Sequence, residues 1–213
     1  FIDKTYDFNI ITSVYPEMIN ELIQFKNDSK FLLICHTVDD CFNDWDNIYY
    51  HTPLGQRYFI PSYFPFYKIV TKSHPKVYIV QGRIQNKRRN YSSLIPIFEK
   101  YKNRDFVIRI LGRGSKLPDI LTKYQDKIQL LNDKKFIEYY NYFNDVSFIL
   151  PLIDDTFKHL YFSSKYSSSI SFGLGFNIPF ITHSKLQEIY SLSGYFYNSQ
   201  EEFSKIFGLT LDL

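Results

Sequence analysis

The sequence predicts an α/β protein whose larger domain is a doubly wound parallel sheet flanked by helices. Short apolar runs alternate with amphipathic stretches over the C-terminal part of the chain, as in repeated strand–helix units. Parallel strands need a crossover connection, so this alternation favours a parallel sheet with helices on both faces. The 213 residues, 45% apolar and 22% charged, have the composition of a packed globular protein.

The larger domain is expected to contain five strands, each a short apolar run that ends in polar residues. The strands lie at 76–80, 106–111, 128–131, 146–150 and 179–181. Amphipathic stretches between and after them predict helices at 91–101, 116–124, 134–143, 167–176 and 199–207.

The N-terminal part has a different pattern and is expected to be a smaller or truncated α/β domain. It contains a strand at 8–12, a helix at 16–27 and a strand at 31–35, with three or four strands in total. Four prolines occur between Pro53 and Pro75, which is typical of a connection between domains. We therefore expect one domain over 1–70 and a second over 71–213, with the boundary between Pro61 and Pro75.

Composition narrows the classes of function and says little about ligands. The net charge of +3 is too small to indicate a nucleic acid, and no apolar run has the roughly 18 residues of a membrane helix. No signal peptide follows Phe1, so we expect a cytoplasmic protein with at most peripheral membrane contact, and the missing initiator Met suggests a fragment or processed form.

Cys35 and Cys41 are expected to be free thiols. Alanine does not occur, and the 21 Phe and 19 Tyr are interpreted mainly as core residues that hold the helices by packing.

A basic loop follows the first strand of the larger domain. Ligands of doubly wound sheets bind at the carboxyl ends of the strands, where this loop lies. It contains Arg83, Lys87, Arg88 and Arg89 directly after Gly82. Arginine forks and a lysine point charge suit a phosphate, although a solvated basic loop would have the same composition.

Two further strand ends have features of anion sites. Gly112-Arg113-Gly114 makes a strand-to-helix turn where backbone N–H groups can approach an anion, but glycines also serve tight turns. The third glycine and the acidic residue of a dinucleotide fingerprint are missing, which disfavours NAD. Six serines and Lys165 lie between Ser163 and Ser171, at the start of a predicted helix. A phosphate site or a simple helix cap would account for them.

The larger domain resembles the C-terminal nucleotide-sugar-binding domain of GT-B fold glycosyltransferases in the order of its strands, loops and helices. The resemblance covers about 76–208 and includes Gly82-Arg83 with Lys87, the Gly-x-Gly turn, Leu150-Pro151, the serine-rich helix and Asn177-Ile178-Pro179. The N-terminal part resembles the later part of a GT-B acceptor domain. The resemblance implies a Rossmann-like, GT-B-like fold and transfer of a sugar from a nucleotide-sugar donor to a hydroxyl of a glycan, lipid or protein.

The resemblance also implies roles for particular residues. The donor diphosphate would be bound by Arg83, Lys87, Arg88, Ser167, Ser168 and Ser169. The nucleotide would be bound by Gly82, Gly112, Arg113, Gly114, Leu131 and Tyr166. Many retaining members have two glutamates near the last loop and helix, where this chain has Lys165 and Ser171-Phe172, so retaining chemistry is not expected.

The chemistry would need a base for the acceptor hydroxyl. The candidates are His36 and Asp39, which follow the second N-terminal strand. Asp39 and Asp40 are adjacent and therefore do not form a D-x-D metal motif, and the remaining histidines lack ligand spacing, so no metal or cofactor is expected. A non-catalytic nucleotide- or carbohydrate-binding module is the alternative. A flavodoxin- or receiver-like module ranks last, because an acidic or flavin-binding loop would replace the basic one.

Overall fold

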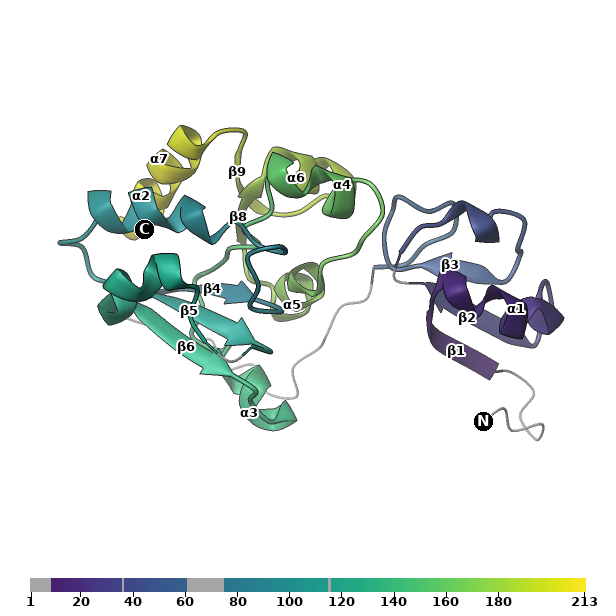
Figure 1. Cartoon of the computed structure of the whole chain (residues 1–213). Coiled ribbons are helices and arrows are strands. Elements are labelled where there is room, and N and C mark those ends of the chain that lie inside the picture. The colour runs from purple at the N-terminus through teal and green to yellow at the C-terminus, as the bar shows by residue number, and fades with distance from the viewer. Residues whose placement is uncertain (1–8, 36, 61–74, 115) are drawn as a thin grey trace. The chain divides into compact units, whose positions relative to one another are not determined.

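The protein folds into two compact units (Figure 1). The computed structural model describes residues 9–35, 37–60, 75–114 and 116–213. Among these, 9–60 together with 159–166 form unit 1, and 75–158 with 167–213 form unit 2. Segment 159–166 belongs to unit 1 because the Val38 amide donates to the Ser164 carbonyl (3.0 Å) and Thr37 pairs with Lys165 in an antiparallel bridge.

Unit 1 contains a parallel sheet in the order β1-β2-β3. The strands are β1 (Asn9–Val14), β2 (Phe31–Cys35) and β3 (Ile48–Tyr50), with Leu33 opposite Ile48. The connection expected as one helix is divided into a 3₁₀ turn at Pro16–Met18, α1 (Ile19–Leu22) and a second 3₁₀ turn at Ile23–Phe25. Leu22 is the one buried residue in these three pieces, so there is too little apolar packing to stabilise a single longer helix.

Unit 2 contains a six-stranded parallel sheet with helices on both faces, which confirms the predicted α/β class. Its order is β6-β5-β4-β7-β8-β9, with every pair parallel. The strands are β4 (Lys76–Gln81), β5 (Phe106–Gly112), β6 (Ile128–Asn132), β7 (Phe148–Ile149), β8 (Phe180–His183) and β9 (Gly194–Tyr197). The chain adds two strands on one side of β4 and then three on the other, so the order reverses between β4 and β7. This is the switch point of a doubly wound, Rossmann-like sheet.

The sixth strand corrects the expected count of five. β9 is four residues long, Gly-Tyr-Phe-Tyr, and only Tyr197 of it is buried, so it is too short to be predicted as a strand. Its pairing depends on tertiary contact: a Cβ at Gly194, where φ is +136°, would lie 2.1 Å from the carbonyl oxygen of Phe180.

The helices of unit 2 differ from expectation at three places. They are α2 (Ile95–Lys100), α3 (Phe136–Asn141), α5 (Ser168–Phe176), α6 (Ser184–Tyr190) and α7 (Gln200–Leu211). α6 was not predicted, and neither was α4 (Lys158–Tyr161), of which 159–161 belong to unit 1. The helix expected at 116–124 is instead a kinked 3₁₀ segment, Asp119–Lys127, which buries only Leu121 and Tyr124. The helix at 91–101 begins as a 3₁₀ turn and becomes α-helical at Ile95, where Pro96 suits a first turn.

The two faces of this sheet are covered by different helices (Figure 1). α2 and α7 cover one face, where the ring of Tyr78 stacks on Phe207 at 4.2 Å between centroids. α3 and α5 cover the other, where Phe143 stacks on Phe172 at 4.7 Å. A Cβ at Gly173 would lie 2.0 Å from the Phe180 ring, so glycine lets α5 approach the sheet closely. The aromatic residues here fill the core.

Candidate functional site

The candidate site lies at the carboxyl end of the unit 2 sheet, at its switch point. Loop 82–90 leaves the end of β4, and segment 150–155 leaves the end of β7. Asn90 joins the two: its amide N–H donates to the Leu152 carbonyl (2.8 Å), and its side chain donates to the Asp154 carboxylate. The loops on the two sides of the switch point are therefore held at fixed positions.

Loop 82–90 also packs against the turn after β5. The Gly82 amide donates to the Leu111 carbonyl (3.0 Å), and the Ile84 amide donates to the Arg113 carbonyl (2.9 Å). Gly114 has φ +154°, and a Cβ there would lie 2.8 Å from the Cβ of Ile84. The glycines of the Gly-x-Gly turn are therefore required for its packing against loop 82–90. The role of this turn in binding a nucleotide stays a prediction.

The four cations of loop 82–90 occupy different environments. Arg83 and Lys87 are exposed and Arg88 is half-buried, so these predicted phosphate ligands lie at or near the surface of the loop. Arg89, the cation left out of the expected site, is only 4% exposed. No local sequence pattern distinguishes it from the other three cations of the loop.

Arg89 connects loop 82–90 to the end of β4 and the start of α5. Its Nη2 donates to the Gln81 carbonyl (3.1 Å), to Ser167 Oγ (3.3 Å) and to Ser169 Oγ (3.4 Å). Its Nη1 donates to the Arg88 carbonyl (2.9 Å). A Cβ at Gly82 would lie 2.7 Å from Nη2, so glycine at this position leaves space for the guanidinium.

The three predicted serines lie together at the start of α5. Ser167 is the N-cap residue, but its hydroxyl donates to Ser169 Oγ (3.4 Å) instead of capping the helix. Ser168 Oγ donates to Gln81 Oε1 (3.1 Å), and Ser169 Oγ donates to the Gln81 carbonyl (3.0 Å). The positive end of the helix dipole and the Arg89 guanidinium therefore meet at one point, which favours an anion.

Gln81, which was not predicted, links α5 to α3. Besides accepting from Ser168, its Nε2 donates to the Tyr139 hydroxyl of α3 (2.8 Å). The side chain is 4% exposed. A polar residue that ends an otherwise apolar strand, immediately before a glycine, is the signal that could have indicated it.

Two predicted nucleotide-binding residues have contacts of their own outside this cluster. Leu131 is buried in β6, so its side chain is core and only its backbone is a candidate for contact with a base. The adjacent turn is fixed by Asp133, whose amide donates to the Gly112 carbonyl (3.2 Å). Tyr166 belongs to unit 1, where its ring packs edge-on against His51 at 6.0 Å.

Of the two candidate bases, one can be placed. His36 lies outside the described residues. Asp39 is the N-cap of a 3₁₀ turn, Asp40–Phe42, and accepts from the Cys41 amide (3.0 Å). Hydrogen bonds from the Cys41 side chain and backbone hold the pKa of Asp39 below its ordinary value, which makes it a weaker base.

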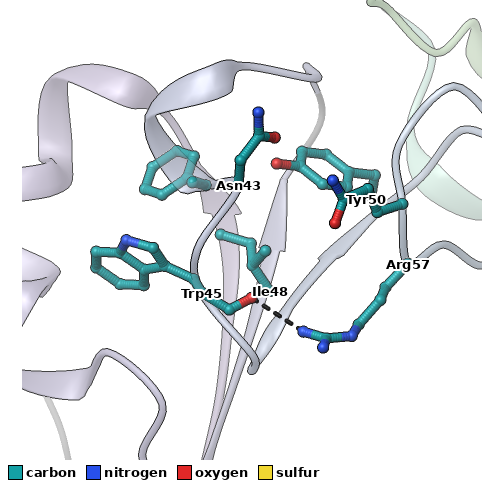
Figure 2. A pocket seen from close by; sticks show the side chains of 7 residues that line it. Asn43, Trp45, Ile48, Tyr50 and Arg57 are labelled. Carbon is teal, nitrogen blue, oxygen red and sulfur yellow. Dashed lines mark hydrogen bonds between the residues drawn. The ribbon is translucent and has the colours of Figure 1, made fainter.

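Each unit also has a hollow. The hollow in unit 1 (Figure 2) is small, with a volume of about 10 Å³, and the Arg57 side chain at its edge donates to the Trp45 carbonyl (3.0 Å). The hollow in unit 2 lies at the amino ends of β4, β5 and β6. There Arg109 Nη1 pairs with Asp145 Oδ1 at 2.6 Å. Doubly wound sheets bind ligands at the opposite edge.

Within the described ranges, no group of three or more His, Cys, Asp or Glu side chains could hold a metal ion. None of the helices in those ranges has the length and apolar character of a membrane-spanning segment. No protein-family model matches the chain, and no curated protein sequence is significantly similar to it. A function must therefore be inferred from the geometry at the switch point.

Proposed function

We propose that this chain is a glycosyltransferase that binds the diphosphate of a nucleotide-sugar donor at the switch point of unit 2. The observation that carries the proposal is the meeting of the basic loop 82–90 with the N-terminus of α5 through Arg89, Ser167 and Ser169. Positive charge, hydroxyl donors and a helix N-terminus at the carboxyl edge of a doubly wound sheet make a site suited to phosphate groups.

Such a site can stabilise a diphosphate as a leaving group. An acceptor hydroxyl attacks the anomeric carbon of the sugar, the bond from that carbon to the diphosphate oxygen breaks, and a base takes the hydroxyl proton. The negative charge that develops on the diphosphate is stabilised by donors already in place at α5 and by the exposed Arg83 and Lys87. The chemistry needs neither a metal ion nor a cofactor, and the base is assigned to His36 or Asp39.

The division of the chain into two α/β units supports the proposal. Each unit has its own parallel sheet, and the larger one has the Rossmann-like strand order. The proposed acceptor is a hydroxyl of a glycan, lipid or protein, and the proposed location is the cytoplasm. The three-stranded sheet of unit 1 is small for a complete acceptor domain, which favours a non-catalytic nucleotide-binding module as the second candidate.

Thermal stability and calorimetry with UDP-, GDP-, CMP- and dTDP-sugars test the proposal. One of these donors at 100 times its Kd should raise the unfolding free energy by about 2.7 kcal/mol. Arg83→Ala and Lys87→Ala should weaken binding of that donor, whereas Lys205→Ala, at an exposed position of α7, should leave it unchanged. Failure of all four donors to bind would refute the proposal. Binding without any release of the free nucleotide (nucleoside diphosphate, or CMP from a CMP-sugar) would favour the non-catalytic module.

A further inference from the structure

We propose that Arg89 is a positioning residue, which holds the first turn of α5 in place for the diphosphate without contacting the diphosphate itself. This inference rests on the proposed function, because it assigns a task within the same site. Of the four cations of loop 82–90, Arg89 is buried and joins the loop to α5, whereas Arg83 and Lys87 are exposed at the surface.

The contacts of Arg89 support this division. One nitrogen, Nη2, lies within 3.1–3.4 Å of three oxygens, which come from the end of β4, the N-cap of α5 and the second residue of α5. The Ser169 hydroxyl donates to the same Gln81 carbonyl that accepts from Arg89. The guanidinium therefore fixes both where α5 begins and how its first hydroxyls point.

The surrounding structure is built around this side chain. Gly82, with φ +125°, leaves space for Nη2, and the Arg89 side chain is 4% exposed. A lysine would retain the charge, but its side chain is one bond shorter and would lose the Nη1 bond to the Arg88 carbonyl, so it cannot make all of these contacts. Positioning by hydrogen bonds and attraction by charge can consequently be separated by experiment.

Salt dependence of binding separates the two roles. Exposed charges are screened by salt much more than buried ones. Arg83→Ala should therefore weaken the binding of inorganic pyrophosphate, UDP and GDP and also reduce the dependence of affinity on salt. Arg89→Lys should weaken the same binding by about ten-fold or more, the loss expected for hydrogen bonds to a charged group. Because lysine keeps the charge, the salt dependence should stay equal to that of the wild type, so the loss of affinity reports lost hydrogen bonds and not a lost charge.

Arg109 is the matched control for general destabilisation. It is also a buried arginine of unit 2, 6% exposed, but it lies in β5 and pairs with Asp145 at the amino edge of the sheet. Arg109→Lys should lower the melting temperature and leave pyrophosphate and nucleotide affinity unchanged. A merely structural role for Arg89 would make Arg89→Lys behave in the same way.

A double-mutant cycle tests whether Arg89 acts through α5. Ser169→Ala removes one acceptor of Arg89 and one donor to Gln81. If the residues act as one unit, Arg89→Lys and Ser169→Ala should each weaken binding, and the double variant should lose much less than the product of the two fold-changes. Should Arg89→Lys fail to fold, Arg89→Gln takes its place in the cycle: a non-additive loss of affinity supports the inference, and an additive loss or unchanged affinity overturns it.

Calorimetry of the wild-type chain and the five variants, at low and high salt, tests the inference. Weaker binding by Arg89→Lys with an unchanged salt dependence and a non-additive cycle supports the inference. A reduced salt dependence, an additive cycle, or affinity equal to that of Arg109→Lys overturns it and leaves the proposed function intact. Wild-type protein that binds none of pyrophosphate, UDP and GDP overturns both.

Discussion

Gly82 and Gly112 meet backbone to backbone at the ends of two neighbouring strands. A Cβ on Gly112 would lie 1.7 Å from the carbonyl oxygen of Gly82. The two loops that border the candidate site are therefore in contact only because position 112 has no side chain. This contact explains the glycine without reference to a ligand.

Gly112→Ala should destabilise the protein strongly. The added methyl meets main-chain atoms rather than a movable side chain, so the loss should be about 3 kcal/mol or more, at the upper end of overpacking effects. Urea unfolding measures the free energy. Gly175→Ala, within α5, is the control and should change stability by about 1 kcal/mol or less, in the stabilising direction. Equal effects would contradict the packing role of Gly112.

Asp145→Ala should leave a buried cation without its main partner. Arg109 donates to both carboxylate oxygens of Asp145, at 2.6 and 3.0 Å. Because Asp145 is itself partly exposed, we expect a loss of about 2–3 kcal/mol, less than for a fully buried pair. Asp119→Ala breaks the exposed pair with Lys116 and should cost about 0.5 kcal/mol or less. Chemical denaturation of both variants provides the comparison.

Stability should fall in alkaline solution because of Cys35. Burial raises the pKa of its thiol from 9.0 to about 12. Between these two pH values the unfolded chain loses the proton and the folded chain keeps it, so the unfolding free energy decreases as pH rises above about 9. Cys35→Val should flatten the decrease between pH 9 and 10, measured as the slope of stability against pH. A slope identical to that of the wild type would show that another group is responsible.

Gln81→Leu should disturb both helices that the Gln81 side chain joins. The substitution removes its bonds to Ser168 and Tyr139 and should cost about 1–2 kcal/mol of unfolding free energy. If the proposed site is correct, pyrophosphate binding should weaken too, because Ser168 loses its acceptor. Tyr139→Phe removes the bond to α3 alone and should leave that binding close to wild type. Calorimetry with equal losses for both variants would argue against a special importance of the Ser168 bond.

The strands were predictable where burial gives a continuous apolar run, as at Phe31–Cys35 and Phe106–Gly112. β9 was not, because it is only four residues long. The amphipathic stretch at 116–124 predicted an α-helix, where the chain instead forms the 3₁₀ segment Asp119–Lys127. Tertiary contacts hold both: Gly194 approaches the Phe180 backbone, and Tyr124 stacks on Phe98 at 4.6 Å. The candidate site was predictable as a region, since strand ends and a serine-rich helix start are visible in sequence.

What the sequence by itself determined is the α/β class, the parallel character of the larger sheet and the gathering of basic residues and serines at strand ends. These follow from apolar periodicity and residue chemistry, which are local properties. Only the tertiary structure decided the strand order with its switch point between β4 and β7, and which cation reaches the serines. Arg89 and Ser169 are 80 positions apart, and their contact depends on the crossover that places α5 beside the end of β4. No local pattern distinguishes this buried guanidinium from the exposed Arg83, because burial is set by the packing of distant segments.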